Sequence, residues 1–216
     1  MKPAVLAIML LVLQTFATRG MSLVPAGQSH ARAVSAPATG VFGGQAVGSD
    51  GMGNFVEGDL NQTPTPFTLD ITRYVSMQEA ERYAQILRAS GQTGLLQALR
   101  NENLGYFRLS GQPPRVVIFA QQSQDATSYT VTALCQRWLD NFVEGFDDRK
   151  ARYPFAYVTL SFDRCGKNQG TLFTAAHVKF GQLGGNGSPL VGVEDYANIP
   201  DRLKDVRFNG PLESVQ

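Results

Sequence analysis

The chain has 216 residues, 43% of them hydrophobic, with 19 Lys and Arg against 18 Asp and Glu and a formal net charge of +1. This apolar fraction is enough for a packed core and excludes a chain that is disordered throughout. The near-neutral charge argues against a nucleic-acid partner, and two His with two Cys exclude a structural zinc cluster, which needs about four such ligands. We expect no metal and no cofactor.

The N-terminus has the pattern of a secretory signal peptide. A basic Lys2 precedes an uninterrupted apolar run over residues 4–13. This run is too short for a transmembrane helix, which needs about 20 residues. Small residues permit cleavage after Ala17 or after Ala33, and an uncleaved membrane anchor is the alternative. We therefore predict a leader over residues 1–33, and a secreted or periplasmic mature chain with no transmembrane segment.

The rest of the chain has the pattern of one domain. Residues 34–65 form a Gly-rich segment in which the alternation over 41–48 predicts a strand. A single α+β domain is expected over 66–210. It opens with a half-buried strand at 67–72, where apolar and polar residues alternate at period two.

A helical hairpin is predicted after this strand. Ser76 and Glu79 have the spacing of a capping box, so a helix should begin there. Apolar residues recur at helical spacing as far as Leu87, and Gly91 is expected to end the helix. A second short helix then carries apolar residues over 95–99. The apolar stripes of the two helices should pack on a sheet.

Strand patterns dominate from residue 104 onward, at the spacing of antiparallel hairpins. The clearest alternating or apolar segments are 116–120, 128–135, 156–162 and 172–180, with further strands expected near 191–193 and 203–208. Strands that follow one helical hairpin, without regular βαβ alternation, favour an α+β fold with a mainly antiparallel sheet, either a sandwich or a curved sheet. A doubly wound parallel fold is disfavoured.

Several short motifs in this order resemble a family of secreted bacterial proteins that is frequent in acidobacteria and has no assigned function. The motifs are Phe67-Thr68-Leu69, Gly91-Gln92 with Leu95-Leu96 and Ala98-Leu99, Gly166-x-x-Gln169-Gly170-Thr171-Leu172, Ala175-Ala176-x-Val178-x-Phe180, Val193-Glu194-x-Tyr196 and Pro200-x-Arg202-Leu203. The resemblance covers roughly 41–208 and implies a single exported domain. The two cysteines and the stretch 136–152 depart from the family's pattern, and no motif is a catalytic signature.

His177 is the main candidate for a catalytic base. Its strand neighbours Leu172, Ala176 and Val178 share the opposite face, so we expect His177 on a solvated face beside Lys179. No Gly-x-Ser-x-Gly elbow positions a nucleophile, and we therefore predict no catalytic residue. A general base at His177 is the alternative, because His titrates near neutral pH.

Cys135 and Cys165 are predicted to form a disulfide, because two cysteines in an exported chain commonly pair. The bridge would close a loop of about 30 residues and stabilise the fold by about 3–4 kcal/mol. Two separate thiols or an intermolecular bridge are the alternatives.

Acidic residues suggest a calcium site or a glycosidase. The candidates are Glu144, Asp147, Asp148, Glu194 and Asp195. The Asp-x-Asp-x-Asp-Gly ladder of a calcium loop is missing, and sequence spacing does not identify a pair of catalytic carboxylates. Basic residues at 149–152 directly follow Asp148, so mutual neutralisation in a solvated loop is the simpler interpretation.

Trp138, Phe142 and Phe146 recur at spacing four. Core packing explains this pattern; if exposed, the three rings form a candidate binding surface for a ligand or partner. We therefore expect an exported, non-catalytic domain that binds a small molecule, an envelope component or a protein partner. The alternative is an extracytoplasmic hydrolase of unknown substrate that uses His177 or acidic residues.

Overall fold

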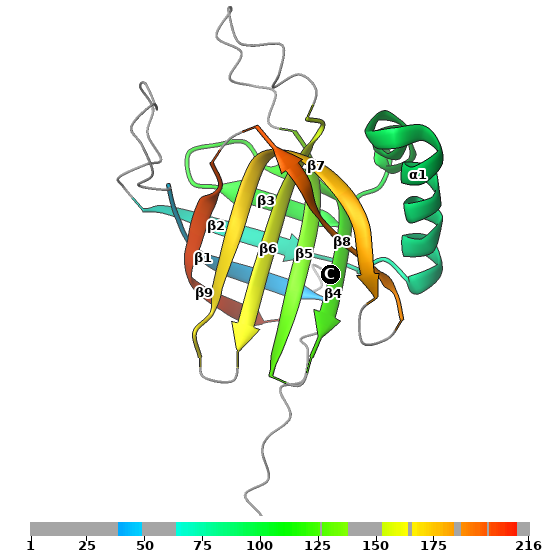
Figure 1. Cartoon of the computed structure of the whole chain (residues 1–216). Helices are drawn as coiled ribbons and strands as arrows, with labels where there is room; N and C mark the ends of the chain where they lie inside the picture. The colour runs from blue at the N-terminus through cyan, green and yellow to red at the C-terminus, as the bar shows by residue number, and fades with distance from the viewer. Residues whose placement is uncertain are drawn as a thin grey trace, which may run out of the picture. The chain divides into compact units, whose positions relative to one another are not determined.

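The computed structural model describes residues 39–48, 64–125, 127–137, 153–163, 166–183, 187–197 and 199–210. These residues form nine strands and one helix (Figure 1). In chain order they are β1 (Gly40–Val47), β2 (Thr65–Ile71), α1 (Met77–Leu99), β3 (Gly105–Leu109), β4 (Arg115–Gln124), β5 (Ser128–Gln136), β6 (Phe155–Asp163), β7 (Gln169–Leu183), β8 (Pro189–Tyr196) and β9 (Asp201–Gly210). The strand predicted in the Gly-rich segment is β1, whereas the predicted leader lies outside the described residues.

Eight of the strands close into an antiparallel barrel. They pair in the order β6-β5-β4-β3-β2-β1-β9-β7, and β6 also pairs with β7, which completes the ring. The predicted α+β sandwich or curved sheet is therefore wrong. Local alternation identifies strands and their buried faces, but it does not say whether the first and last strands of a sheet meet.

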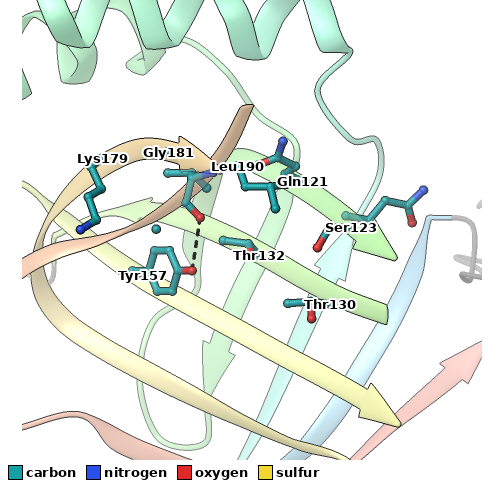
Figure 2. A pocket seen from close by; sticks show the side chains of 11 residues that line it. Gln121, Ser123, Thr130, Thr132, Tyr157, Lys179, Gly181 and Leu190 are labelled. Atoms are coloured by element: carbon teal, nitrogen blue, oxygen red, sulfur yellow. Dashed lines mark hydrogen bonds between the residues drawn. The ribbon is translucent and has the colours of Figure 1, made fainter. Parts of the chain in front are cut away.

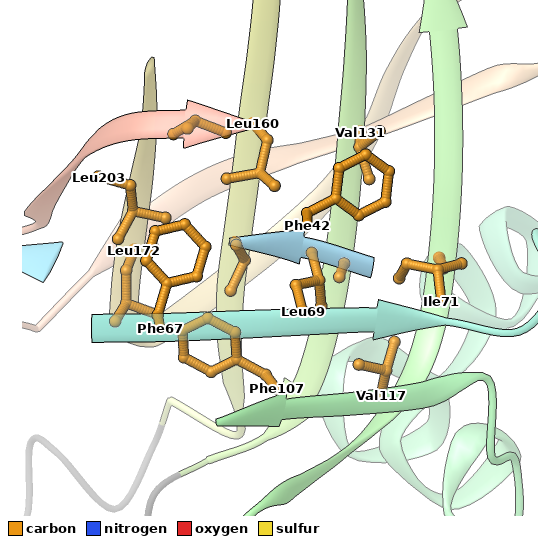
Figure 3. Close-up of a cluster of buried hydrophobic side chains, with 14 of the residues drawn as sticks. Phe42, Phe67, Leu69, Ile71, Phe107, Val117, Val131, Leu160, Leu172 and Leu203 are labelled. Carbon is orange, nitrogen blue, oxygen red and sulfur yellow. The ribbon is translucent and has the colours of Figure 1, made fainter. Parts of the chain in front are cut away.

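Apolar side chains from every barrel strand fill the interior (Figure 3). The ring of Phe42 lies 5.7 Å from that of Phe162 and 5.3 Å from that of Phe208. The predicted alternation in β5 and β6 is confirmed, since its apolar residues all belong to this interior cluster: Tyr129, Val131, Ala133, Cys135, Ala156, Val158, Leu160 and Phe162. An eight-stranded barrel has an interior just wide enough for such a filling.

Strand β7 leaves the barrel part-way along its 15 residues. Residues 169–176 pair with β6, whereas residues 176–183 pair with β8. A register shift interrupts the pairing with β6, and the buried face changes across it: Leu172 lies in the barrel interior, but Ala176 and Val178 belong to a second, outer cluster. The predicted single apolar face that Leu172 shares with Ala176 and Val178 is therefore wrong. We call residues 176–183 together with β8 the arm.

The predicted capping box at the start of α1 is confirmed. The Ser76 backbone N–H donates to Glu79 Oε2 at 2.7 Å, and the Glu79 N–H donates to Ser76 Oγ at 3.2 Å.

The predicted helical hairpin is wrong, because α1 is one helix with a kink at Gly91. Gly91 has φ 64° and ψ −165°, a conformation that only Gly adopts without strain. The two helical segments meet directly at this kink, and Tyr83 before it and Leu95 after it belong to the same outer cluster. Within the part of the chain that the structure describes, no helix combines the length and hydropathy that a membrane span requires.

Candidate functional site

The arm folds over the outer wall of the barrel and packs there with α1. Their buried residues form the outer cluster, whose members are Tyr83, Leu95, Leu99, Ile118, Phe119, Leu134, Phe155, Tyr157, Ala176, Val178 and Val191. A register shift between Val117 and Phe119 in β4 places both Ile118 and Phe119 in this outer cluster. The Phe119 ring lies 6.1 Å from Tyr83 of the helix and 5.8 Å from Phe180 of the arm, so it joins all three parts.

The Gln121 side chain ties β8 to the barrel wall. Its Nε2 donates to the carbonyl oxygen of Pro189 at 2.8 Å and to Ser188 Oγ at 3.3 Å, and its Oε1 accepts from the Val191 N–H at 3.1 Å. Gln121 is only 5% exposed. Both the nitrogen and the oxygen of the Gln121 amide therefore bind the backbone of β8.

The Gln92 side chain ties β7 to the helix in the same way. Its Nε2 donates to the Val178 carbonyl oxygen at 2.7 Å, and its Oε1 accepts from the Val178 N–H at 3.2 Å. Because the pairing of β7 with β6 ends at Ala176, Gln92 satisfies backbone groups that have left the barrel ladder.

A pocket of about 560 Å³ lies between the outer wall and the arm (Figure 2). We call it the wall pocket. Its lining residues are Gln121, Gln122, Ser123, Thr130, Thr132, Tyr157, Lys179, Gly181, Leu190, Val191 and Gly192. Six of these eleven residues carry a hydroxyl or amide side chain, and Lys179 is the one charged member of the lining.

Tyr157 of β6 lines the wall pocket. Its hydroxyl reaches the Val191 carbonyl oxygen at 3.5 Å, the contact drawn as a dashed line in Figure 2. Burial raises the pKa of Tyr157, an effect that hydrogen bonds with Thr132 and Thr159 partly offset. The phenol is therefore protonated at neutral pH and carries no charge into the pocket.

A second pocket of about 590 Å³ lies on the helix side of the arm. It shares Lys179 and Gly181 with the wall pocket, and it adds Arg88 of α1 and Glu194 of β8. Charges of both signs line it, so its electrostatic preference is weaker than that of the wall pocket.

His177 lies beside an acidic residue, Asp195, its partner in the β7–β8 register. The ring of Tyr153 stacks on His177 with 4.4 Å between the centroids, and the Tyr153 hydroxyl donates to Asp195 Oδ2 at 2.6 Å. This bond, the N–H of Tyr196 and the charge of His177 all lower the pKa of Asp195. His177 is half-buried, Asp195 is exposed, and neither residue lines the two pockets described above.

The predicted disulfide is wrong, because Cys135 carries a free, fully buried thiol in the barrel interior. Cys135 pairs with Ala156 at the start of β6, whereas Asp163 ends that strand. Seven residues of extended strand span about 23 Å, and the two further residues to Cys165 span at most about 7 Å. Bridged cysteines need Cα atoms within about 7 Å. Burial raises the pKa of Cys135 to about 12, so this thiol is not a nucleophile at neutral pH.

Several predicted residues lie outside the described part of the chain. They are Trp138, Phe142, Phe146, Glu144, Asp147, Asp148 and Cys165. Within the described ranges, no group of three or more His, Cys, Asp or Glu is placed to hold a metal ion.

Comparison with protein-family models, with curated proteins and with solved structures finds no match to this chain.

Proposed function

We propose that the protein is an exported, non-catalytic binding protein that holds a small polar molecule in the wall pocket. The pocket itself carries this proposal. Its volume of about 560 Å³ falls within the range of about 300–1,000 Å³ that small-molecule sites occupy. Its lining combines apolar surface from Leu190 and Val191 with hydroxyl groups from neighbouring strands.

The way in which the arm is fixed supports a preformed site. Gln121 and the Tyr157 hydroxyl hold β8 on the wall side, while Gln92 holds β7 on the helix side. A ligand that enters a pocket with fixed walls loses less of its binding free energy to ordering the protein.

The reactive side chains among the described residues favour binding over catalysis. The Cys135 thiol is buried in the barrel and protonated. His177 has an acidic neighbour, but it lies outside the lining of both pockets. Export rests on the leader pattern at residues 4–13 and on the resemblance to exported bacterial proteins. N-terminal sequencing of protein from the extracytoplasmic fraction tests it, and an intact Met1 on soluble cytoplasmic protein would refute it.

The binding proposal is tested by filling the pocket. A Cβ atom added at Gly192 would meet no heavy atom within 4 Å, so Gly192→Leu places a side chain in open space at the pocket lining. We expect this variant to fold and to lose binding of compounds found by a small-molecule screen that follows amide chemical shifts. Lys204→Leu is the control, since it adds the same side chain at an exposed position of β9.

Two results would count against the proposal. Ligands that bind Gly192→Leu as tightly as the natural protein would place the site elsewhere. Turnover of ester, peptide or glycoside substrates that is abolished by His177→Gln, in a protein that stays folded, would support the hydrolase alternative.

A further inference from the structure

The charged side chains that line the wall pocket are positive only. Lys179 is the one charged residue in its lining, and no carboxylate belongs to that lining. Within the described residues, Lys179 forms no direct ion pair, although Glu194 lines the second pocket together with it. A pocket with one unpaired cation favours a ligand with an anionic group.

The Lys179 side chain has no neighbouring side chain directly across the strand pair. Its cross-strand partner in β8 is Gly192, which has no side chain to compete for the space between the strands and the wall. Figure 2 shows Lys179 at the edge of the pocket, on the same side as Tyr157. The Lys179 ammonium group can therefore bind an anionic group of a ligand at the edge of the wall pocket, while the rest of the ligand lies inside the pocket.

The wall supplies hydroxyl groups in a fixed pattern. Ser123 of β4 pairs with Thr130 of β5, and Gln121 pairs with Thr132 two residues further along the same face. Paired side chains on one face of a sheet lie about 5 Å apart. Each hydroxyl can donate and accept a hydrogen bond, so this row matches a ligand with several hydroxyl groups. Gln121 itself is engaged with β8 and shapes the pocket.

From these observations we infer that the ligand is a small polyhydroxylated organic acid, such as a sugar acid, whose carboxylate binds Lys179 and whose hydroxyls bind Ser123, Thr130 and Thr132. This inference rests on the proposed binding function of the same pocket. The apolar surface of Tyr157 and Leu190 would cover the C–H face of such a molecule.

Matched pairs of compounds test the inference, each pair differing in one carboxylate: glucuronate with glucose, galacturonate with galactose, and gluconate with glucitol. Dissociation constants are measured by NMR titration at low salt. We expect at least one acid to bind about fivefold more tightly than its neutral partner, as for one exposed charge-assisted contact. The preference should weaken between about 20 and 200 mM salt, because the charges are screened.

Three variants separate the preference for an acidic ligand from the location of the site. In Lys179→Met, the acid and its neutral partner should bind with equal affinity. Lys204→Met, which removes an exposed lysine from β9, should keep the preference. Gly192→Leu should abolish binding of both compounds.

Three other outcomes would refute, in turn, the acidic ligand, the role of Lys179 and the binding function itself. Equal affinities within every pair, with binding still lost in Gly192→Leu, would refute the acidic ligand and leave the binding function standing. An acid preference that survives Lys179→Met would refute the role of Lys179. If no compound of the screen binds in a manner sensitive to Gly192→Leu, the proposed function fails, and the inference fails with it.

Discussion

Gln92 and Gln121 use their side-chain amides in the same way on the two strands of one arm. Gln92 bonds both the N–H and the carbonyl oxygen of Val178 in β7, and Gln121 bonds the Pro189 carbonyl oxygen and the Val191 N–H in β8. In each case an amide replaces the peptide group of a missing neighbouring strand. The two contacts therefore satisfy strand edges that would otherwise be open to pairing with another chain.

Loss of the Gln121 contact should loosen the arm. We expect Gln121→Leu to lower the free energy of unfolding by about 2–3 kcal/mol, because the buried Val191 N–H and Pro189 carbonyl lose their partner. Urea denaturation measures this change, and hydrogen exchange of the Val191 amide should accelerate. Gln169→Leu, an exposed position of β7, is the control and should change stability by less than about 0.5 kcal/mol. Equal losses in the two variants would contradict the role assigned to Gln121.

Asp201 should make the protein less stable as the pH rises from about 4 to about 6. Burial raises the pKa of Asp201 to about 6, against about 3.9 in an unfolded chain. In this window the unfolded state has lost its proton while the folded state keeps it, so rising pH favours unfolding. Asp201→Asn should remove this effect and be more stable than the natural protein at pH 7 by about 2 kcal/mol, with no difference below pH 4. Parallel stability profiles from pH 3 to pH 7 would show that Asp201 does not titrate in this way.

Cys135 should be unreactive in the folded protein. Its thiol is fully buried and its raised pKa keeps it protonated, so iodoacetamide at pH 8 should modify Cys135 only after unfolding. Peptide mapping by mass spectrometry identifies the modified residue. A reducing agent should leave the melting temperature unchanged. A peptide that contains Cys135 disulfide-linked in an unreduced digest would contradict the structure.

The features that the sequence predicts correctly depend on residues close together in the chain. The capping box at Ser76 and Glu79 involves a spacing of three, and the buried face of β5 follows from strict alternation between Tyr129 and Cys135. Both patterns are local, so no knowledge of distant partners is needed to see them.

The features that the sequence does not reveal depend on distant pairings. Closure of the barrel requires β6 to meet β7 and β7 to meet β9, and the change of face between Leu172 and Ala176 requires a register shift against β6. A bulge adds a residue and reverses the faces of the strand after it, so alternation read straight through it assigns the wrong face.

The candidate site was missed for a related reason. Thr130 and Thr132 alternate with buried residues and therefore have the pattern of a solvated face. The arm covers that face, as long-range contacts such as those of Gln121 with Pro189 and of Tyr157 with Val191 show. Gln121 directly follows the apolar run 116–120, but in the sequence alone it indicates no more than the end of a buried segment.

Tyr74 offers a test of the barrel interior, because its buried hydroxyl has no hydrogen-bond partner among the described residues. The side chain packs against the interior cluster, and burial raises the pKa of Tyr74, with the nearby Tyr129 adding to the effect. A buried polar group without a partner costs about 1–3 kcal/mol. Tyr74→Phe keeps the ring and removes the hydroxyl, so it should raise the free energy of unfolding by about 1 kcal/mol.

Tyr83→Phe is the matched comparison for this substitution. The Tyr83 hydroxyl donates to Glu102 Oε1 at 3.0 Å and accepts from Arg82 Nη2 at 2.9 Å, so its removal should lower stability by about 1 kcal/mol. Urea denaturation of both variants under one set of conditions gives two changes of opposite sign if the hydrogen-bond partners decide the outcome. A loss of stability in Tyr74→Phe as large as that in Tyr83→Phe would mean that the Tyr74 hydroxyl is hydrogen-bonded in solution, for which a water inside the barrel is the simplest explanation.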